Sequence, residues 1–310
     1  RIFWTSTKSP LSNITTFISI SATLSCKSDN ERVLKFDPFV ATGISEDNIA
    51  GIIASTSSTA KEGMEFLASI IDQNGSAEAN IVMALDQNEA WYMEIYSGHQ
   101  YAAVKCPDNM ILTAGNEFVF DSLESMGIKL EDTILSGELL TKLPKEKRKP
   151  ANCENIMELN LFETYSEQLV KYGADTQLPL GDAEQEKIRI ETDNSHRRTW
   201  CGYHLFAPSQ FSKYCGVKYP AFYDPDDGFK SLDIHDVTRF MRDRFETVTD
   251  LNFDYDREKN QLRYVACERA YQVHAIQSDP SLPKEMAATM WLSLCNPNYT
   301  PFVPINAGVN

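Results

Sequence analysis

The stretch from Ala79 to Asn116 constrains the fold of this chain more than any other. It holds four apolar runs rich in β-branched and aromatic residues: Ile81–Leu85, Ala90–Tyr96, Tyr101–Val104 and Met110–Thr113. The breaks at Asp86-Gln87-Asn88 and Ser97-Gly98 favour turns, because Asn and Gly tolerate positive φ and Asp bonds its own backbone. The pattern predicts an antiparallel meander, with Asn116 at the end of its last strand.

A helix is predicted directly before the meander. Thr59 and Glu62 form a capping box, in which the two residues satisfy each other's exposed N–H groups. Apolar residues follow at helical spacing (60, 64, 67, 70 and 71), and Asn74-Gly75 is a typical C-terminal stop. We therefore expect a helix over residues 59–73. A helix next to an antiparallel sheet indicates an α+β fold, with helices covering one face of the sheet.

The remaining patterns are less regular. We expect a short strand at Val33–Phe36, a connecting segment at Gly43–Ala54, helical periodicity in 124–143 and 155–172, a solvated turn at Lys145–Lys149, a polar loop with a short strand at Gly181–Asn194, a helix at Ser231–Phe245, a strand at Leu262–Ile276 and an extended stretch from Trp291 onwards. The prolines of that last stretch bar it from helix and from central sheet pairing. No internal repeat or Gly/Ser-rich linker divides the chain, so we predict a single domain over residues 1–310.

Charge and hydropathy exclude several classes of partner. The formal net charge of −15 disfavours nucleic acid and anionic membranes, which need a basic footprint. No apolar run approaches the roughly 20 residues of a membrane helix. Lys8, Pro10 and several Ser and Thr residues interrupt the apolar opening Arg1–Ser25, so the pattern of a signal peptide is absent. We expect neither a nucleic acid nor a membrane as a partner.

The cysteines favour a reducing environment. The seven cysteines are odd in number and show no C-x-x-C pair (26, 106, 153, 201, 215, 267 and 295). In a long acidic chain this favours free thiols and a cytoplasmic location over a disulfide framework. Cys106, Cys267 and Cys295 lie in apolar runs and are expected in the core.

Several familiar site motifs are absent from the sequence, namely G-x-S-x-G, G-x-x-x-x-G-K-[ST], G-x-G-x-x-G and H-E-x-x-H. The nearest approach to a metal site is the group His196, Cys201, His204 and Cys215, in which only Cys201-x-x-His204 comes close to the spacing of zinc ligands. We favour core thiols and surface imidazoles over zinc at these positions. No metal and no cofactor is therefore predicted.

Three positions carry side chains suited to binding. Arg197-Arg198 can hold a carboxylate through paired N–H bonds, although the local sequence favours an ordinary ion pair. The Asn116 amide can serve something bound beside the sheet, or it can cap a turn. His99 follows the Ser97-Gly98 turn and can titrate near neutral pH, or it can be a solvent-exposed turn residue. These residues indicate an anion-friendly cleft at the end of the sheet.

Several long, ordered motifs resemble the dipeptidases of peptidase family C69. They are DPFVATGISEDNIA, AKEGMEFLASIIDQNGSAEAN, MALDQNEAWYMEIYSGHQYAAVKCPDN and VHAIQSDPSLPKEMAATMWLSLCNPNYTPFVP, with RRTWCGYHLFAPS and YPAFYDPDDGFKSLDIHDV as shorter collinear matches. The resemblance runs from about Ala22 to the C-terminus and leaves residues 1–21 unmatched. It implies an N-terminal-nucleophile hydrolase with a four-layer αββα sandwich of mostly antiparallel sheets, in line with the expected α+β class.

The resemblance also implies a mechanism. In that family a cysteine at the mature N-terminus attacks the peptide carbonyl, its own α-amino group acts as the base, and water releases the acyl-enzyme. Asn116 falls where the superfamily has its oxyanion-binding asparagine, and Arg198, or its neighbour Arg197, falls where related enzymes place an active-site arginine. These three residues are the catalytic candidates. His99 is the candidate for substrate binding, and a short peptide is the expected substrate.

One departure from the family concerns the nucleophile. The sequence begins with Arg1, and its first cysteine, Cys26, lies in SATLSCKSDN, which aligns well inside the family pattern. We therefore expect a chain that lacks the N-terminal strand and the nucleophile, and hence a sandwich that is incomplete at its N-terminus.

Two other functions stay open. The superfamily shares its machinery with acylases that cleave penicillins or conjugated bile acids, and the choice of substrate resides in the pocket. A non-catalytic binding or partner protein is the alternative from another class, because a missing central strand leaves sheet edges that invite association. A homo-oligomer is therefore among the states to be considered.

Overall fold

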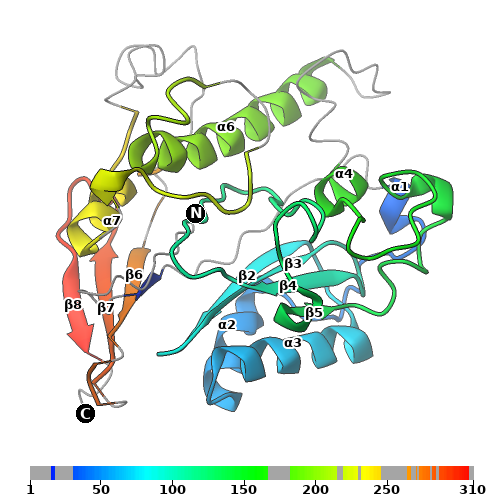
Figure 1. The fold of residues 1–310 in the computed structure, drawn as a ribbon, viewed down its shortest axis with the longest axis horizontal. Helices are drawn as coiled ribbons and strands as arrows, with labels where there is room; N and C mark the ends of the chain where they lie inside the picture. The colour runs from blue at the N-terminus through cyan, green and yellow to red at the C-terminus, as the bar shows by residue number, and fades with distance from the viewer. Residues whose placement is uncertain are drawn as a thin grey trace. The chain divides into compact units, whose positions relative to one another are not determined.

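The structure is a computed structural model that describes residues 15–17, 31–166, 182–214, 219–229, 232–245, 264–266, 270, 272–279, 281–283 and 286–306. Its elements are β1 (Thr15–Phe17), α1 (Glu31–Leu34), α2 (Glu46–Thr56), α3 (Ala60–Asn74), β2 (Asn80–Leu85), β3 (Ala90–Ile95), β4 (Tyr101–Lys105), η1 (Leu130–Asp132), β5 (Thr133–Leu135), η2 (Lys145–Lys147), α4 (Leu161–Tyr165), α6 (Asp182–Phe206), η3 (Asp227–Phe229), α7 (Ile234–Met241), β6 (Gln272–Ser278), β7 (Ala288–Leu294) and β8 (Val303–Asn306). The described strands of both sheets are antiparallel and combine with helices, as Figure 1 shows, so the predicted α+β class is confirmed.

The internal contacts of the chain group it into two compact units. Unit 1 comprises Arg1–Ser19, Pro107–Gly115 and Ile190–Asn310, and unit 2 comprises Ile20–Cys106 and Asn116–Arg189. Each unit is described by itself below. The single domain and the four-layer sandwich expected from the sequence stay predictions.

Unit 2 is built on a four-stranded antiparallel sheet in the order β2-β3-β4-β5. The first three strands of the predicted meander are confirmed, and they pair in register along their lengths. The Asp86 side chain turns the first hairpin, because its Oδ1 accepts from the N–H groups of Asn88 at 2.7 Å and Glu89 at 3.0 Å. The turn predicted at Asp86-Gln87-Asn88 is therefore confirmed.

Helix α3 precedes this sheet; its C-terminal cap is as expected, and its N-terminal capping box is confirmed only in part. The Thr59 hydroxyl accepts from the N–H of Glu62 at 3.1 Å, and the Glu62 carboxylate accepts from the N–H of Ser58 rather than that of Thr59. Gly75 ends the helix at a φ of 76°, a conformation that glycine adopts without strain, and its N–H donates to the Ile71 carbonyl. The predicted helix is confirmed.

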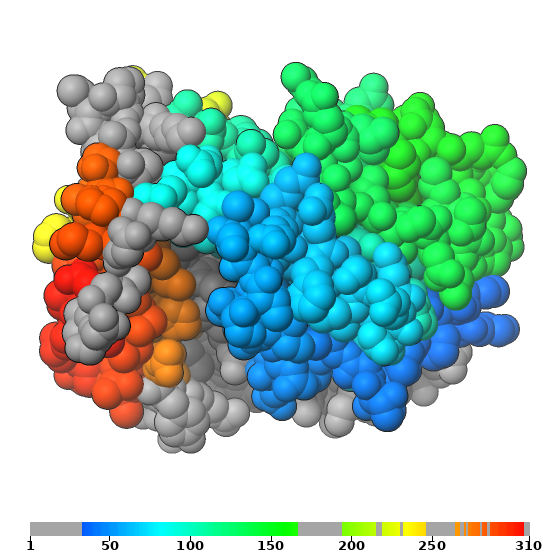
Figure 2. Space-filling model, turned by 90° about the horizontal axis from the view of Figure 1, so that it is seen from below, coloured from blue at the N-terminus to red at the C-terminus, as the bar shows by residue number. Residues whose placement is uncertain are grey.

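Helices α2 and α3 cover one face of the sheet in Figure 1, and their outer side forms the blue surface in Figure 2. Between helices and sheet lies an apolar core that includes Met64, Leu67, Ile71, Val82, Trp91, Met93, Ile95 and Ala103. Alternate residues of a strand point to opposite faces, so Tyr92 of β3 and Tyr96, the residue directly after the strand, point away from this core.

The opposite face of β3 is covered by aromatic side chains. Phe120 packs edge-on against Tyr92 with ring centroids 5.2 Å apart, and Phe118 does the same against Tyr96 at 4.8 Å. Tyr165 of α4 stacks on Tyr96 at 4.3 Å. The segment that follows Asn116 is therefore held against the sheet by its aromatic residues.

Unit 1 contains a second antiparallel sheet, in the order β1-β6-β7-β8, and the part of the helix α6 from Ile190 onwards. The end of its stretch Pro107–Gly115 lies close against α6. Gly115 donates its N–H to Thr199 Oγ1 at 2.8 Å, and a Cβ at Gly115 would lie 2.5 Å from the carbonyl oxygen of Ser195. Only glycine fits this approach without a backbone shift.

Two predicted strands are wrong. The run Met110–Thr113 is not the fourth strand of the meander, because Ile111 instead exchanges backbone bonds with Tyr223 at 2.9 and 3.0 Å, and β5 pairs with β4. Asn116 consequently lies in a bend rather than at a strand end. The stretch Val33–Phe36 is not a strand, because α1 occupies its first half and the N–H of Phe36 closes a turn on the Val33 carbonyl.

Two helices occur where the sequence predicts none. At Gly43–Ala54, predicted as a connection, α2 begins after Ser45, and its first N–H group donates to Glu78 Oε1 at 2.9 Å. At Gly181–Asn194, predicted as a loop with a short strand, the chain forms the first half of α6. Seven of the thirteen residues 182–194 are Ala, Glu, Gln, Lys or Arg, whose high helix propensity prevails although no apolar stripe is visible.

The expected helical periodicity of 124–143 and 155–172 is mostly wrong: these stretches form turns, η1, the strand β5 and the short α4, and residues 167–172 lie outside the described ranges. Lys145–Lys149 is a turn with η2, as predicted, but Arg148 within it is buried rather than solvated. Its guanidinium donates to the carbonyl oxygens of Leu143 at 3.0 Å and Cys153 at 2.9 Å.

The C-terminal expectations are partly confirmed. α7 lies within the predicted helix Ser231–Phe245, and its cap is Asp233 rather than Ser231. Only the last part of Leu262–Ile276 belongs to β6; residues 264–266 are irregular, and 262, 263, 267–269 and 271 are not among the described residues. The terminal stretch is extended, with Pro304 in the edge strand β8, but its start lies in the central strand β7, contrary to the prediction.

Candidate functional site

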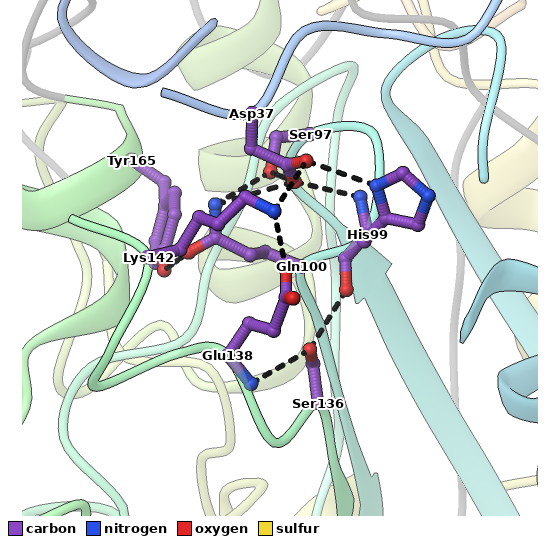
Figure 3. Close-up of polar contacts among 8 residues, drawn as sticks. All are labelled: Asp37, Ser97, His99, Gln100, Ser136, Glu138, Lys142 and Tyr165. Atoms are coloured by element: carbon purple, nitrogen blue, oxygen red, sulfur yellow. Dashed lines mark hydrogen bonds and ion pairs between the residues drawn. The ribbon is translucent and has the colours of Figure 1, made fainter.

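A polar cluster in unit 2 surrounds the carboxylate of Asp37, which is only 1% exposed (Figure 3). Its Oδ2 accepts from Ser97 Oγ at 2.7 Å, from the N–H of His99 at 2.7 Å and from Gln100 Nε2 at 3.3 Å. Its Oδ1 accepts from His99 Nδ1 at 3.0 Å and lies 3.8 Å from Lys142 Nζ. One buried carboxylate therefore ties the segment after α1 to the turn between β3 and β4.

The ionisation of Asp37 follows from these donors. Burial is the largest influence and by itself raises the pKa of Asp37, but the hydrogen bonds from His99, Ser97 and Gln100 outweigh it. The pKa of this carboxyl consequently lies below its usual 3.8. The group is negatively charged at neutral pH.

Further bonds fix the donors themselves. The Tyr165 hydroxyl donates to Gln100 Oε1 at 2.6 Å, and Gln100 Nε2 also donates to Ser97 Oγ at 2.9 Å. Ser136 Oγ donates to the carbonyl oxygen of His99 at 2.7 Å. Burial raises the pKa of Tyr165 far above its usual value, so its hydroxyl stays protonated and remains a donor.

His99 is the candidate residue that this cluster holds. Its side chain is 31% exposed, and Nδ1 faces the Asp37 carboxylate. We therefore assign the proton of the neutral ring to Nδ1, which leaves Nε2 as an acceptor. The sequence indicates an anion-friendly cleft, whereas the group that the His99 ring contacts is the acid Asp37. The Asp37 carboxylate and the Nε2 acceptor therefore favour a bound hydrogen-bond donor or a cation near His99.

Asn116, the candidate oxyanion donor, is half-buried at the start of the second stretch of unit 2. Among the described residues, its buried Oδ1 finds no hydrogen-bond partner. The Oδ1 and Nδ2 atoms of an asparagine are told apart by their hydrogen-bond partners. One of these two atoms of Asn116 therefore has no partner among the described residues.

Arg197 and Arg198 lie on α6 in unit 1 and have different surroundings. Arg198 is 1% exposed, and its guanidinium donates to the Asn194 carbonyl oxygen at 3.2 Å and to Ser195 Oγ at 3.3 Å. Arg197 is half-buried, and its guanidinium lies 4.7 Å from the centroid of the Tyr214 ring. The two guanidiniums therefore contact different neighbours within unit 1.

The residues weighed as zinc ligands show no metal site in the part of the chain that the structure describes. The buried Cys201 thiol donates to Asp243 Oδ1 at 3.1 Å, as a core thiol would. His196 is buried, so it is not the surface imidazole that the sequence predicts. His204 stacks on Trp200 at 4.7 Å, and Cys215 lies outside the described residues.

The other cysteines separate into two groups. Cys106 is a free, buried thiol, as predicted, and burial raises its pKa far above the usual value. Cys153 is also free and buried. Cys295 is exposed, so its predicted place in the core is wrong. Cys26 and Cys267 are not among the described residues.

Two buried acids, Asp37 and Glu94, are important in unit 2 and were not singled out by the sequence patterns. Glu94 is fully buried in β3, on the same face as Tyr92 and Tyr96. The available signal was a charged residue inside the apolar run Ala90–Tyr96, because acids are almost never fully buried without partners.

The chain belongs to peptidase family C69, whose family model matches residues 13–310. It is similar to a probable dipeptidase B of Streptococcus pyogenes serotype M1, with 26% identity over 299 residues, which cover 93% of this chain and 54% of the relative. A probable dipeptidase of Latilactobacillus sakei is 25% identical over 297 residues, covering 94% and 56%, and one of Salmonella dublin is 23% identical over 278 residues, covering 89% and 58%. The chain spans about half the length of the relatives it matches.

Within the described residues, no helix combines the length and the apolar character that crossing a bilayer requires.

Proposed function

We propose that this chain belongs to a cysteine-type dipeptidase, which hydrolyses short peptides through an acyl-enzyme. The observation that carries the proposal is the match to peptidase family C69 over residues 13–310, and relatives named as probable dipeptidases support it. The proposed architecture is the four-layer αββα sandwich, which the antiparallel sheet of each unit supports.

The proposed nucleophile is a cysteine thiolate whose own α-amino group takes the proton, as the resemblance implies. The thiolate attacks the peptide carbonyl, the amine leaves with a proton, and water then hydrolyses the thioester. Both addition steps place negative charge on the carbonyl oxygen, which needs fixed donors.

Asn116 is the proposed donor to that oxyanion. A buried amide atom without a partner costs about 1–3 kcal/mol, so its retention supports a role in binding a ligand. The half-buried Asn116 side chain has such an atom among the described residues. When the amide presents Nδ2, it can stabilise a developing oxyanion without moving.

Arg198 is proposed as the active-site arginine, with Arg197 as the alternative. The bonds of Arg198 to Asn194 and Ser195 fix its guanidinium on α6, as a charge that must be held in one place requires. His99 is proposed to contact the substrate, because its Nε2 acceptor and the Asp37 carboxylate behind it suit the amino group of a short peptide.

The test compares variants of the protein, each made in the form that shows dipeptide hydrolysis in an assay. Asn116→Ala is expected to lower kcat by about 100- to 1,000-fold and to change KM little, because the oxyanion exists only in the transition state. Asn88→Ala is the matched control, since Asn88 is exposed and the turn uses only its backbone N–H. Equal effects on kcat and KM would indicate a structural asparagine.

The substrate class and the nucleophile are tested with the same protein. A panel of dipeptides, a penicillin and a conjugated bile acid should show a preference for the dipeptides; the reverse preference would indicate an acylase. Alkylation of all cysteines should abolish turnover. Full turnover after complete alkylation would rule out the cysteine mechanism, and binding of dipeptides without hydrolysis would favour a non-catalytic binding protein.

A further inference from the structure

The buried Glu94 carboxylate stands out in unit 2 because it lies on an aromatic face of the sheet. It comes from the middle of the apolar run of β3 and is 0% exposed, with Tyr92 and Tyr96 on either side on the same face. A buried charge is strongly unfavourable unless hydrogen bonds compensate for the lost water. The bonds that hold Glu94 therefore indicate what it does.

Two of these bonds come from the backbone that follows Asn116. Glu94 Oε1 accepts from the N–H of Val119 at 2.5 Å and from the N–H of Phe120 at 3.3 Å. Its Oε2 accepts from the Tyr96 hydroxyl at 3.0 Å. Bonds to an ionised acceptor are about twice as strong as neutral ones, so this carboxylate is a firm anchor for residues 119 and 120.

The anchored segment has no regular secondary structure between Asn116 and Phe120, so no strand ladder or helix fixes its path. The segment also contacts α4, through the bond from the Phe162 N–H to the Phe120 carbonyl oxygen at 2.8 Å. Phe118 and Phe120 add apolar contacts to β3, which are less directional than hydrogen bonds. Beside these aromatic contacts, Glu94 supplies directional bonds that orient the backbone N–H groups at 119–120.

We propose that Glu94 is a positioning residue for the Asn116 amide. By fixing the backbone three and four residues downstream, it sets how the chain leaves the bend at Asn116 and so helps to orient the amide. The inference rests on the proposed function of Asn116 as an oxyanion donor. A displacement of a catalytic group by about 1 Å can lower the rate by about 100-fold. An anchor three or four residues from Asn116 can therefore affect kcat.

The first test is structural and needs no activity. In the 310-residue chain, Glu94→Gln weakens the acceptor for the two N–H groups while keeping the shape of the side chain. Amide hydrogen exchange at Val119 and Phe120 is expected to accelerate at least tenfold. Tyr96→Phe is the matched control, because it removes only the third bond to the same carboxylate, and exchange at 119–120 should change far less. Unchanged exchange in Glu94→Gln would overturn the anchoring.

The second test is a double-mutant cycle in the form of the protein for which dipeptide hydrolysis is measured. Glu94→Gln alone is expected to lower kcat by about 10- to 100-fold with KM changed less than about twofold. In the Asn116→Ala background the same substitution should lower kcat by less than about twofold, since there is no amide left to position. Tyr96→Phe should lower kcat much less than Glu94→Gln, although both remove a bond from the same buried group.

The outcomes separate this inference from the proposed function. Suppose that Asn116→Ala lowers kcat, and that adding Glu94→Gln lowers it further by the same factor as Glu94→Gln alone. The two residues then act independently, so the positioning role is overturned, while the role of Asn116 stands. If Asn116→Ala leaves kcat unchanged, the proposed role of Asn116 is overturned, and the positioning role with it.

Discussion

At the scale of single residues, the two buried carboxylates of unit 2 perform the same task in different places. Asp37 and Glu94 each collect hydrogen bonds from segments that are distant in sequence and irregular in structure. A carboxylate suits this task because it offers several acceptor sites and no donor. The sequence shows the acids but not their partners, since a partner such as Val119 contributes only its backbone N–H.

The Asp37 cluster gives a prediction for stability. Asp37→Asn should lower the free energy of unfolding at pH 7 by about 3 kcal/mol, because the new amide NH₂ faces donors and leaves buried groups unsatisfied. Chemical denaturation at pH 7 measures the loss. Asp108→Asn is the control, since Asp108 is exposed, and it should change the free energy of unfolding by less than about 0.5 kcal/mol. A loss as small as that of the control would show that the cluster does not stabilise the fold.

The same residue gives a pH dependence. The pKa of Asp37 is lower in the folded state than in the unfolded chain, so its stabilisation is complete above the unfolded pKa and is lost as the pH falls through the folded one. The difference in stability between the wild type and Asp37→Asn should therefore shrink below about pH 4. Urea unfolding at several acidic pH values checks this. A difference that grows towards low pH would contradict the assigned ionisation.

Thiol reactivity tests the burial of the cysteines. Cys295 is exposed, whereas Cys106 is buried with a raised pKa, and only an accessible thiolate reacts quickly. Cys295→Ser should remove one rapidly reacting thiol from the native protein in a colorimetric thiol assay. Cys106→Ser should leave the fast phase unchanged, and loss of a fast thiol in that variant would contradict the buried position.

At the scale of elements, prediction from the sequence succeeds where the caps are local. The caps of α3, Thr59 and Gly75, are the residues directly before and after the helix, and the sequence predicts this helix well. The N-terminus of α2 is satisfied by Glu78, 32 residues away, and no local pattern can show that. The Met110–Thr113 run has strand composition, yet its pairing partner Tyr223 decides its structure.

Two glycines in the helices of unit 2 should respond in opposite ways to alanine. Gly51 lies in the interior of α2, is exposed and has open space around an added Cβ, so Gly51→Ala should stabilise the protein by about 1 kcal/mol. A Cβ at Gly63 in α3 would lie 2.6 Å from Ile53 Cγ2, so Gly63→Ala should destabilise it by about 1–3 kcal/mol. Thermal unfolding of both variants measures the contrast; a shift of the same sign in both would contradict the packing of α2 on α3.

At the scale of the whole molecule, the two sheets differ in how far the sequence reveals them. β2, β3 and β4 are neighbours in sequence and joined by short turns, so the pattern gives most of the sheet in unit 2. In unit 1, Thr15 of β1 pairs with Ser278 of β6. A pairing across most of the chain leaves no local trace, and the family resemblance, not the periodicity, indicates that such a sheet exists.

The excess of acidic residues gives a prediction for the whole chain. With a net charge of −15, repulsion among surface charges opposes the compact state. Raising sodium chloride from about 10 mM to about 300 mM shortens the screening length severalfold, and should shift the midpoint of urea unfolding upwards. A downward shift would show that attractive surface pairs outweigh the net repulsion.

The Asp37 carboxylate also has a consequence for the order in which the chain folds. Its bonds to Ser97 and Gln100 close a loop of 60 to 63 residues, whereas the β3–β4 hairpin that carries these donors forms over a few residues. Short loops close first, and long-range contacts must wait for the entropy of loop closure to be offset. The hairpin should therefore be present in the transition state for folding before Asp37 docks. Asp37→Asn would then mainly accelerate unfolding and leave the folding rate nearly unchanged, so this carboxylate would set how long the native state of unit 2 persists.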